Sequence, residues 1–332
     1  SKIYYGDRTI KGDSLYYNKN IEYASATGNI KVIDTVNETV IKGGYAEYFK
    51  LKDSVYITDR AVAISKMEND SVYIHGDKLM VTGKTEDRII KAFKRVKIFK
   101  SDLQGKCDSL VTEEKTGITI LFTNPVLWAE GNQITGDTIH FLSNTKTEQL
   151  DSLKILTNGL MVKKDSSGFS QLKGKNMYGK FKNNNLESLD AIGNSETLFF
   201  LRDENQKLFG IDKKQCSDHI LILLENNDVK SIDYYKMISG KTYPPSEFEK
   251  LKENEKTLKG FVWREDERPL TKDDIFIKDD EITTTETEKP TSKEVQKKQN
   301  SEPKKVVKPL ILKEKDTVSK KVINQPVIPK KE

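Results

Sequence analysis

The segment TIKGDSLYYNKNIEYASATGNIKVID, residues 9–34, contains the unit from which most of this chain is built. The unit starts with an isoleucine two residues before a glycine and ends in a short strand with alternating apolar residues. The Ile/Leu-x-Gly step recurs at Gly12, Gly43, Gly76, Gly105, Gly136, Gly174 and Gly210, and subtraction of neighbouring numbers gives spacings of 31, 33, 29, 31, 38 and 36 residues. Spacings in this range are typical of stacked-repeat proteins, so we expect a stack of similar rungs.

The glycine of each unit is expected to mark a corner in the sheet. In five units the third residue after the glycine is apolar, so the apolar positions on either side of it have opposite parity. Side chains alternate between faces along a strand, and a parity break therefore indicates a bulge or bend. Asp13, Asp77 and Asp137 directly follow three of the glycines. We interpret them as turn residues rather than calcium ligands, because the Gly-Gly-x-Gly-x-Asp pattern is absent.

The second half of each unit is a short strand that is expected to line an apolar interior. In the first four rungs the pattern is mostly one-sided, with apolar residues spaced by two, and in the later rungs all the residues of the strand are apolar. Spacing by two predicts a half-buried strand, whereas a continuous apolar run is typical of burial on both faces. The candidate interior residues are Ile30, Val32, Val62, Ile64, Val96, Ile98, Val126 and Trp128. Lys31 and Lys97, between them, are expected to face outward.

The 332 residues divide into three expected regions. Residues 1–243 contain the repeats. Residues 244–270 form a cap, in which PPSEFEKLKENEK (residues 244–256) predicts a short helix because proline suits a first helical turn and Phe248 and Leu251 lie three apart. Residues 271–332 form a charged tail that is acidic first and then lysine-rich, and from about residue 277 it should be disordered because it can bury little apolar surface. No aromatic residues alternate with the lysines, so we expect no nucleic-acid partner.

The sequence offers no catalytic, metal or cofactor motif. His75, His140 and His219 lie in strand-like segments without a nucleophile or carboxylate at relay spacing. Cys107 and Cys216 do not have metal-ligand spacing and fall in different rungs, so we expect two free, buried thiols. Phosphate-binding and nucleophile-elbow patterns are also missing. The chain is therefore predicted not to be an enzyme.

Units of the form I-x-G-D-x-[LI]-x-[YF], followed by a strand such as ATGNIKVID (residues 26–34), resemble the OstA-like/LptA-like family of lipopolysaccharide transport proteins. The stretch DHILILLENNDVKSIDYYKMISGKTYPPSEF and the following LKGFVWREDERP (residues 258–269) resemble the C-terminal part of Bacteroidetes-type OstA-like proteins. The resemblance covers most of residues 1–270. The units after Gly136 are longer than this pattern, and the charged tail lies outside it.

The resemblance implies an all-β fold, an open V-shaped or taco-like β-jellyroll of stacked antiparallel strands. It also implies a non-enzymatic periplasmic protein whose apolar groove holds the acyl chains of lipopolysaccharide between the inner and outer membranes. Its partners would be other jellyroll proteins of the same transport system, joined through edge strands, or further copies of the chain. The alternative from the residues alone is a carbohydrate-binding or adhesive β-solenoid, or a scaffold that polymerises through its ends.

Overall fold

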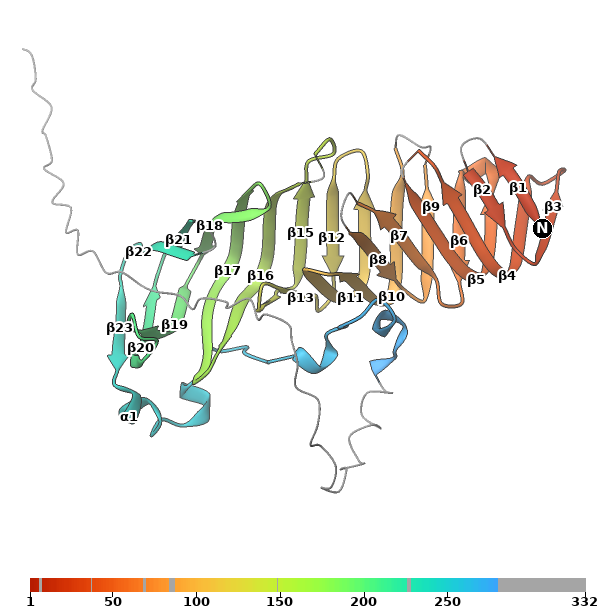
Figure 1. The fold of residues 1–332 in the computed structure, drawn as a ribbon. Helices are drawn as coiled ribbons and strands as arrows, with labels where there is room; N and C mark the ends of the chain where they lie inside the picture. The colour runs from red at the N-terminus through yellow and green to blue at the C-terminus, as the bar shows by residue number, and fades with distance from the viewer. Residues whose placement is uncertain are drawn as a thin grey trace, which may run out of the picture.

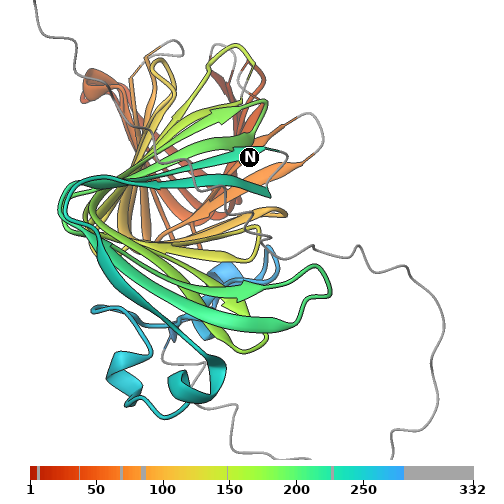
Figure 2. The same cartoon turned by 90° about the vertical axis from the view of Figure 1, so that its left-hand side faces the viewer.

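The computed structural model describes residues 1–279 apart from 6–7, 37, 68–69, 84–86, 148 and 226–227. These residues form one antiparallel sheet of 23 strands, folded along its length into two walls that meet at a bend (Figures 1 and 2). The prediction of an all-β, V-shaped stack is confirmed.

Six long strands run through the bend and belong to both walls: β4 (Tyr23–Asp34), β5 (Thr39–Phe49), β10 (Ile89–Lys100), β11 (Leu103–Glu113), β16 (Leu150–Asp165) and β17 (Gly168–Lys182). The other strands pair within one wall only. Wall 1 is completed by β1 (Lys2–Tyr5), β2 (Arg8–Lys11), β7 (Val62–Lys66), β8 (Ser71–His75), β13 (Val126–Ala129), β14 (Asn132–Thr135), β19 (Ser195–Arg202), β20 (Leu208–Cys216) and β23 (Ser239–Tyr243). Wall 2 is completed by β3 (Ser14–Asn18), β6 (Ser54–Thr58), β9 (Lys78–Thr82), β12 (Ile118–Phe122), β15 (Thr138–Ser143), β18 (Asn185–Ile192), β21 (His219–Glu225) and β22 (Asp228–Tyr234).

The bend is made by pairs of consecutive residues in the left-handed region of φ. One pair lies in each rung: Gly28-Asn29, Asp59-Arg60, Lys94-Arg95, Thr123-Asn124, Thr157-Asn158, Gly193-Asn194 and Lys236-Met237. Two such residues in succession insert a kink that shifts the strand register, as seen between Thr27 and Ile30. The expected corner in every rung is therefore present.

Backbone hydrogen bonds tie each corner to the preceding pass of the chain. In each corner the carbonyl of the first left-handed residue accepts a hydrogen bond from a backbone N–H, as in Asp13 N–H to Gly28 O at 3.0 Å. In five rungs the donor is the residue that directly follows the repeat glycine. Gly105 and Gly210 differ from the expectation, because they pair within wall 1, with Leu127 and Leu201, and the corner comes later in the chain.

The aspartates after the glycines have a structural role at these corners. Asp13 accepts a 2.8 Å hydrogen bond from Asn29, and Asp137 accepts one of 3.0 Å from Asn158. Asp77 forms an ion pair with Arg95 at 2.8 Å. Each carboxylate thus holds the second left-handed residue of its own corner, in agreement with the interpretation of these aspartates as turn residues.

After β23 the chain forms the short helix α1 (Pro245–Phe248) and the 3-10 turns η2 (Glu253–Glu255), η3 (Glu265–Glu267) and η4 (Asp274–Phe276); another 3-10 turn, η1 (Lys50–Lys52), lies between β5 and β6. The predicted helix is present but shorter than residues 244–256. The segment containing α1 and η2–η4 runs back along the outside of wall 1 (Figures 1 and 2). We call residues 244–279 the C-terminal strap.

The packed part of the chain extends beyond the boundary expected at residue 271. Ile275 is buried, and the Phe276 ring lies edge-on to His75 with ring centroids 4.9 Å apart. Residues 271–279 thus belong to the strap, and the remainder of the expected charged tail lies outside the described residues.

Candidate functional site: the interior between the two walls

Two rows of apolar side chains face each other across the interior. Each row follows paired positions from strand to strand, so that each strand in it contributes one residue to the row of its wall. The wall 1 row is Ile10, Val32, Ile41, Ala63, Ile74, Ile98, Gly105, Leu127, Ile134, Met161 and Leu172. The wall 2 row is Leu15, Ala26, Ala46, Ile57, Leu79, Ala92, Leu110, Leu121, Ile139, Ile155, Met177, Ala191 and Ile220.

All of these residues except Gly105 belong to one continuous hydrophobic cluster or pack against it. The stack therefore has a single apolar core that runs along its length. Towards the last rungs this core becomes more polar, where the hydroxyls of Thr197 in wall 1 and Tyr234 in wall 2 lie 3.0 Å apart.

Four of the eight predicted interior residues lie in this core. Ile30, Val32, Val96 and Ile98 are at most 8% exposed and belong to the cluster between the walls. They come from the long strands β4 and β10, in which a lysine separates the two apolar residues. Lys31 and Lys97 accordingly lie on the outer face of wall 1, as predicted.

The other four lie on the opposite face of wall 1, which corrects their sequence-based assignment. In β7 the residue that pairs with core residues Ile41 and Ile74 is Ala63, so its neighbours Val62 and Ile64 point outward. In β13 the core residue is Leu127, so Val126 and Trp128 also point outward. The prediction was wrong at these positions because three consecutive apolar residues give no parity signal.

Three of the outward apolar residues, Val62, Val126 and Trp128, are nevertheless buried, because the C-terminal strap covers this face, and Ile64 is half-buried. Val126 and Trp128 are at most 1% exposed. At the far end of the wall, Leu198 and Phe200 pack with Phe248 and Leu258 of the strap. One pattern in the sequence indicates such a cover: strands that are apolar on both faces need a layer on each side.

Three buried glutamines on the outer face of wall 1 bind the strap in succession. Gln171 accepts a hydrogen bond from the backbone N–H of Leu258 at 2.8 Å. Gln133 donates to the carbonyl of Val262 at 2.7 Å and accepts from the N–H of Arg264, also at 2.7 Å. Gln104 accepts from the Arg268 guanidinium at 2.8 Å. The strap is thus aligned antiparallel to the order of the rungs, residue by residue.

Ion pairs hold the end of the strap. The ammonium of Lys97 donates to the carbonyl of Ile277 at 2.7 Å and lies 3.1 Å from the carboxylate of Asp279. Lys106 pairs with Asp279 at 2.9 Å and also with Glu267. Hydrogen bonding to Arg264 is the main cause that lowers the pKa of Glu267, so this carboxylate stays charged at neutral pH.

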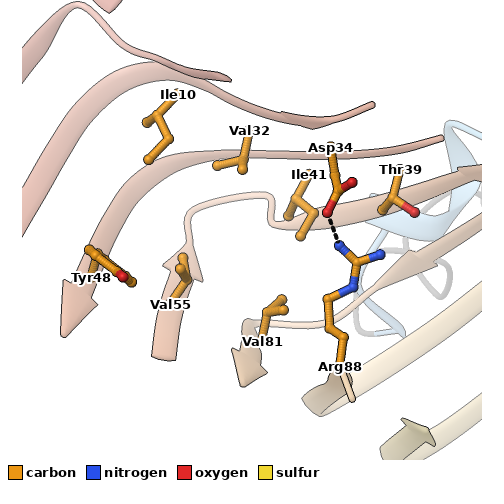
Figure 3. A pocket seen from close by; sticks show the side chains of 9 residues that line it. All are labelled: Ile10, Val32, Asp34, Thr39, Ile41, Tyr48, Val55, Val81 and Arg88. Carbon is orange, nitrogen blue, oxygen red and sulfur yellow. Dashed lines mark hydrogen bonds and ion pairs between the residues drawn. The ribbon is translucent and has the colours of Figure 1, made fainter. Parts of the chain in front are cut away.

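The mouth of the V, opposite the bend, is closed near the first rungs by a buried charge cluster. Arg88 precedes β10 in wall 2 and is 2% exposed. Its guanidinium makes two contacts of 2.8 Å with Glu114, which follows β11 in the same wall. A third contact, of 2.5 Å, crosses to Asp34 at the end of β4 in wall 1 (Figure 3). Arg88 therefore links the two walls.

A small apolar cavity lies directly inside this cluster. Ile10, Val32 and Ile41 line it from wall 1, and Tyr48, Val55 and Val81 line it from wall 2 (Figure 3). Its volume is about 30 Å³, roughly the space of one water molecule. In the described conformation the interior is packed with side chains, and a lipid chain could enter only if the walls moved apart.

The remaining reactive side chains have structural environments. His75 lies 2.6 Å from the carbonyl of Ala61 through Nδ1, and burial is the main cause that lowers its pKa. Burial raises the pKa of the Cys107 thiol to about 12, and both Cys107 and Cys216 are free and buried, as predicted. In the part of the chain that the structure describes, no three His, Cys, Asp or Glu side chains are grouped as a metal site would require.

No protein-family model matches the chain, and no curated protein matches it. Among solved structures it is similar to the crystal structure of LptH from Pseudomonas aeruginosa, described as the LptA homologous periplasmic component of the conserved lipopolysaccharide transport device. The two are 14% identical, and the match covers 32% of this chain and 75% of that one with a TM-score of 0.29. Within the described residues, no helix is long and apolar enough to cross a membrane.

Proposed function

We propose that this chain is a non-enzymatic lipid carrier whose acyl-chain path is the interior between the two walls. The observation that supports this is the pair of apolar rows, which face each other without interruption by charge from the first rungs to the sixth. A chain lying along these rows is shielded from water, and each buried methylene is worth about 0.8 kcal/mol. Because the first six rungs present the same kind of apolar surface, a chain can slide from one of these rungs to the next without a large barrier.

The resemblance of the repeat to the OstA-like/LptA-like family narrows the proposal to lipopolysaccharide carried across the periplasm. Edge strands at the two ends of the stack would join it to neighbouring jellyroll proteins. The packed interior adds a requirement, since the two walls must separate to admit a chain. Loading is therefore expected to widen the V.

Photo-crosslinking tests the path of the lipid. A photoreactive residue at Ile98 or Met161, both on the inner face, should capture lipid during expression, and extraction followed by mass spectrometry should identify it. The same residue at Lys31 or Trp128, on the outer face of the same wall, should capture none. Circular dichroism of each variant verifies that the sheet is intact. Equal capture on both faces contradicts the path, and a lipid-free protein that polymerises end to end supports the scaffold alternative.

A further inference from the structure

We propose that Arg88 is a head-group site: an anionic group attached to an alkyl chain replaces Asp34 on the Arg88 guanidinium when the walls separate. This inference rests on the proposed function and names the residue that would recognise the ligand. The ligand chemistry is a phosphate or carboxylate oxygen next to an apolar chain.

The three contacts of Arg88 differ in what happens when the mouth opens. Glu114 is in the same wall as Arg88, and the backbone N–H of Glu114 also donates to the Arg88 carbonyl at 3.0 Å. Its two side-chain contacts therefore survive separation of the walls. Asp34 belongs to the other wall, so its contact is the one that must break. Among the described residues, one face of the guanidinium then has no anionic partner.

A buried guanidinium that loses a carboxylate is strongly destabilised unless another anion takes its place. Arginine binds carboxylate and phosphate oxygens through charge-assisted hydrogen bonds, so an anionic head group is a suitable replacement. Asp34 is at the end of its strand, next to a turn in which it accepts a hydrogen bond from the Val36 N–H at 3.1 Å. The Asp34 carboxylate therefore keeps a backbone donor when its contact with Arg88 breaks.

The cavity supplies the other half of the site. Its apolar lining begins beside the guanidinium, where Val32 and Ile41 of wall 1 face Val55 and Val81 of wall 2 (Figure 3). Opening at this rung would extend a space that is already apolar and place it in line with the inner rows. A charged head at Arg88 and a chain between the walls thus fit one amphiphilic molecule.

Binding of three probes with the same twelve-carbon chain tests the proposal: dodecyl phosphate, laurate and neutral dodecyl maltoside, each below its micelle concentration. We expect the full chain to bind at least one anionic probe about tenfold more tightly than the maltoside. Preference for the phosphate alone indicates a phosphorylated lipid, and preference for laurate indicates a fatty acid.

Two variants locate the preference. Arg88→Met should weaken binding of the anionic probe by about tenfold and leave the maltoside within about twofold. Asp34→Asn removes the competing carboxylate but keeps the arginine, and should strengthen binding of the anionic probe several-fold. If Arg88→Met does not fold, this variant alone tests the head-group site. Equal binding of neutral and anionic probes, or weaker anionic binding by Asp34→Asn, overturns the head-group site while leaving the lipid path intact. Binding of none of the probes overturns both.

Discussion

At the scale of single residues, buried polar side chains determine how the outer layer attaches. Gln133 is fully buried, yet both ends of its amide are satisfied by the backbone of the strap. A buried amide of this kind stabilises only one alignment of its partner, because any shift leaves donor and acceptor unsatisfied. Gln104 and Gln171, in neighbouring rungs, each accept one hydrogen bond from the strap and donate to a backbone carbonyl close to them in the chain.

Gln133→Ala should lower the free energy of unfolding by about 2 to 3 kcal/mol, because it removes two hydrogen bonds and leaves the Val262 carbonyl and the Arg264 N–H without their partner. Denaturant titration followed by Trp fluorescence measures this change. The matched control is Gln215→Ala, at an exposed position of β20, which should change stability by no more than about 0.5 kcal/mol. Equal effects of the two substitutions would contradict the role of Gln133.

His75 should make the fold sensitive to mild acid. Burial lowers its pKa below the ordinary value of 6.5, and the charges of Arg60 and Lys97 act in the same direction. Between the folded and unfolded pKa the unfolded chain binds more protons, so stability falls as the pH drops below about 6.5. His75→Asn keeps a donor near the Ala61 carbonyl but does not titrate. It should reduce the acid-dependent decrease in the free energy of unfolding by up to about 1.4 kcal/mol per pH unit. Thermal unfolding at pH 7.5 and pH 5 measures it; an unchanged difference would refute the prediction.

At the scale of elements, the rungs are joined by corners and the stack ends in edges. Each corner is local, since its left-handed residues and its backbone hydrogen bond lie within one rung. The edges are different. Among the described strands, β1 pairs only with β2 and β3 only with β4, so one end of the stack presents backbone groups with no strand beside them. At the other end, β23 leads directly into Pro244 and α1.

We expect β1 to recruit a strand from a neighbouring jellyroll protein or from a second copy of the chain. Backbone N–H groups alternate between the two sides of a strand. One of the two substitutions Tyr4→Pro and Tyr5→Pro therefore removes an N–H donor from the unpaired side of β1. At least one of these variants should lose association while the far-ultraviolet circular dichroism stays unchanged. Tyr4→Thr, which keeps the N–H, is the control. Sedimentation and pull-down that match wild type for both proline variants would rule out pairing through β1.

At the scale of the whole molecule, the sheet and the strap form two layers on opposite sides of wall 1. The inner face of this wall packs on wall 2, and the outer face packs under residues 244–279. Wall 1 is therefore held between two partners, whereas no such strap contact is made by the outer face of wall 2 within the described residues. If the walls separate during lipid loading, the strap should keep wall 1 rigid and wall 2 should move.

Two truncations test the contribution of the strap. A chain that ends after Asp279 should keep the melting temperature of the full chain, because the composition of residues 280–332 allows little apolar burial. A chain that ends after Tyr243 loses the buried side chains of Phe248, Leu258 and Ile275. It should lose on the order of 5 kcal/mol and melt about 10 °C lower or more. Equal melting temperatures for the two truncated chains would show that the strap does not stabilise the stack.

The features that depend on local geometry can be predicted from the amino-acid sequence. Glycine spacing predicts the rungs, parity breaks predict the corners, and the Ile-Lys-Val and Val-Lys-Ile patterns place Ile30, Val32, Val96 and Ile98 on the inner face. Each of these follows from the alternation of side chains and the φ preferences of a few neighbouring residues.

Which face of an all-apolar strand points inward, and what covers its other face, depends on contacts between distant segments and is seen only in the folded chain. Val62, Ile64, Val126 and Trp128 lie under or beside a layer that arrives from far along the chain; the contact between Gln133 and Val262 spans 129 residues. The closure of the mouth by Arg88 and Asp34, 54 residues apart, is equally non-local. An apolar side chain can be buried against any apolar surface of suitable shape. Which surface covers it is therefore set by the packing of distant segments and not by the residue pattern of either segment.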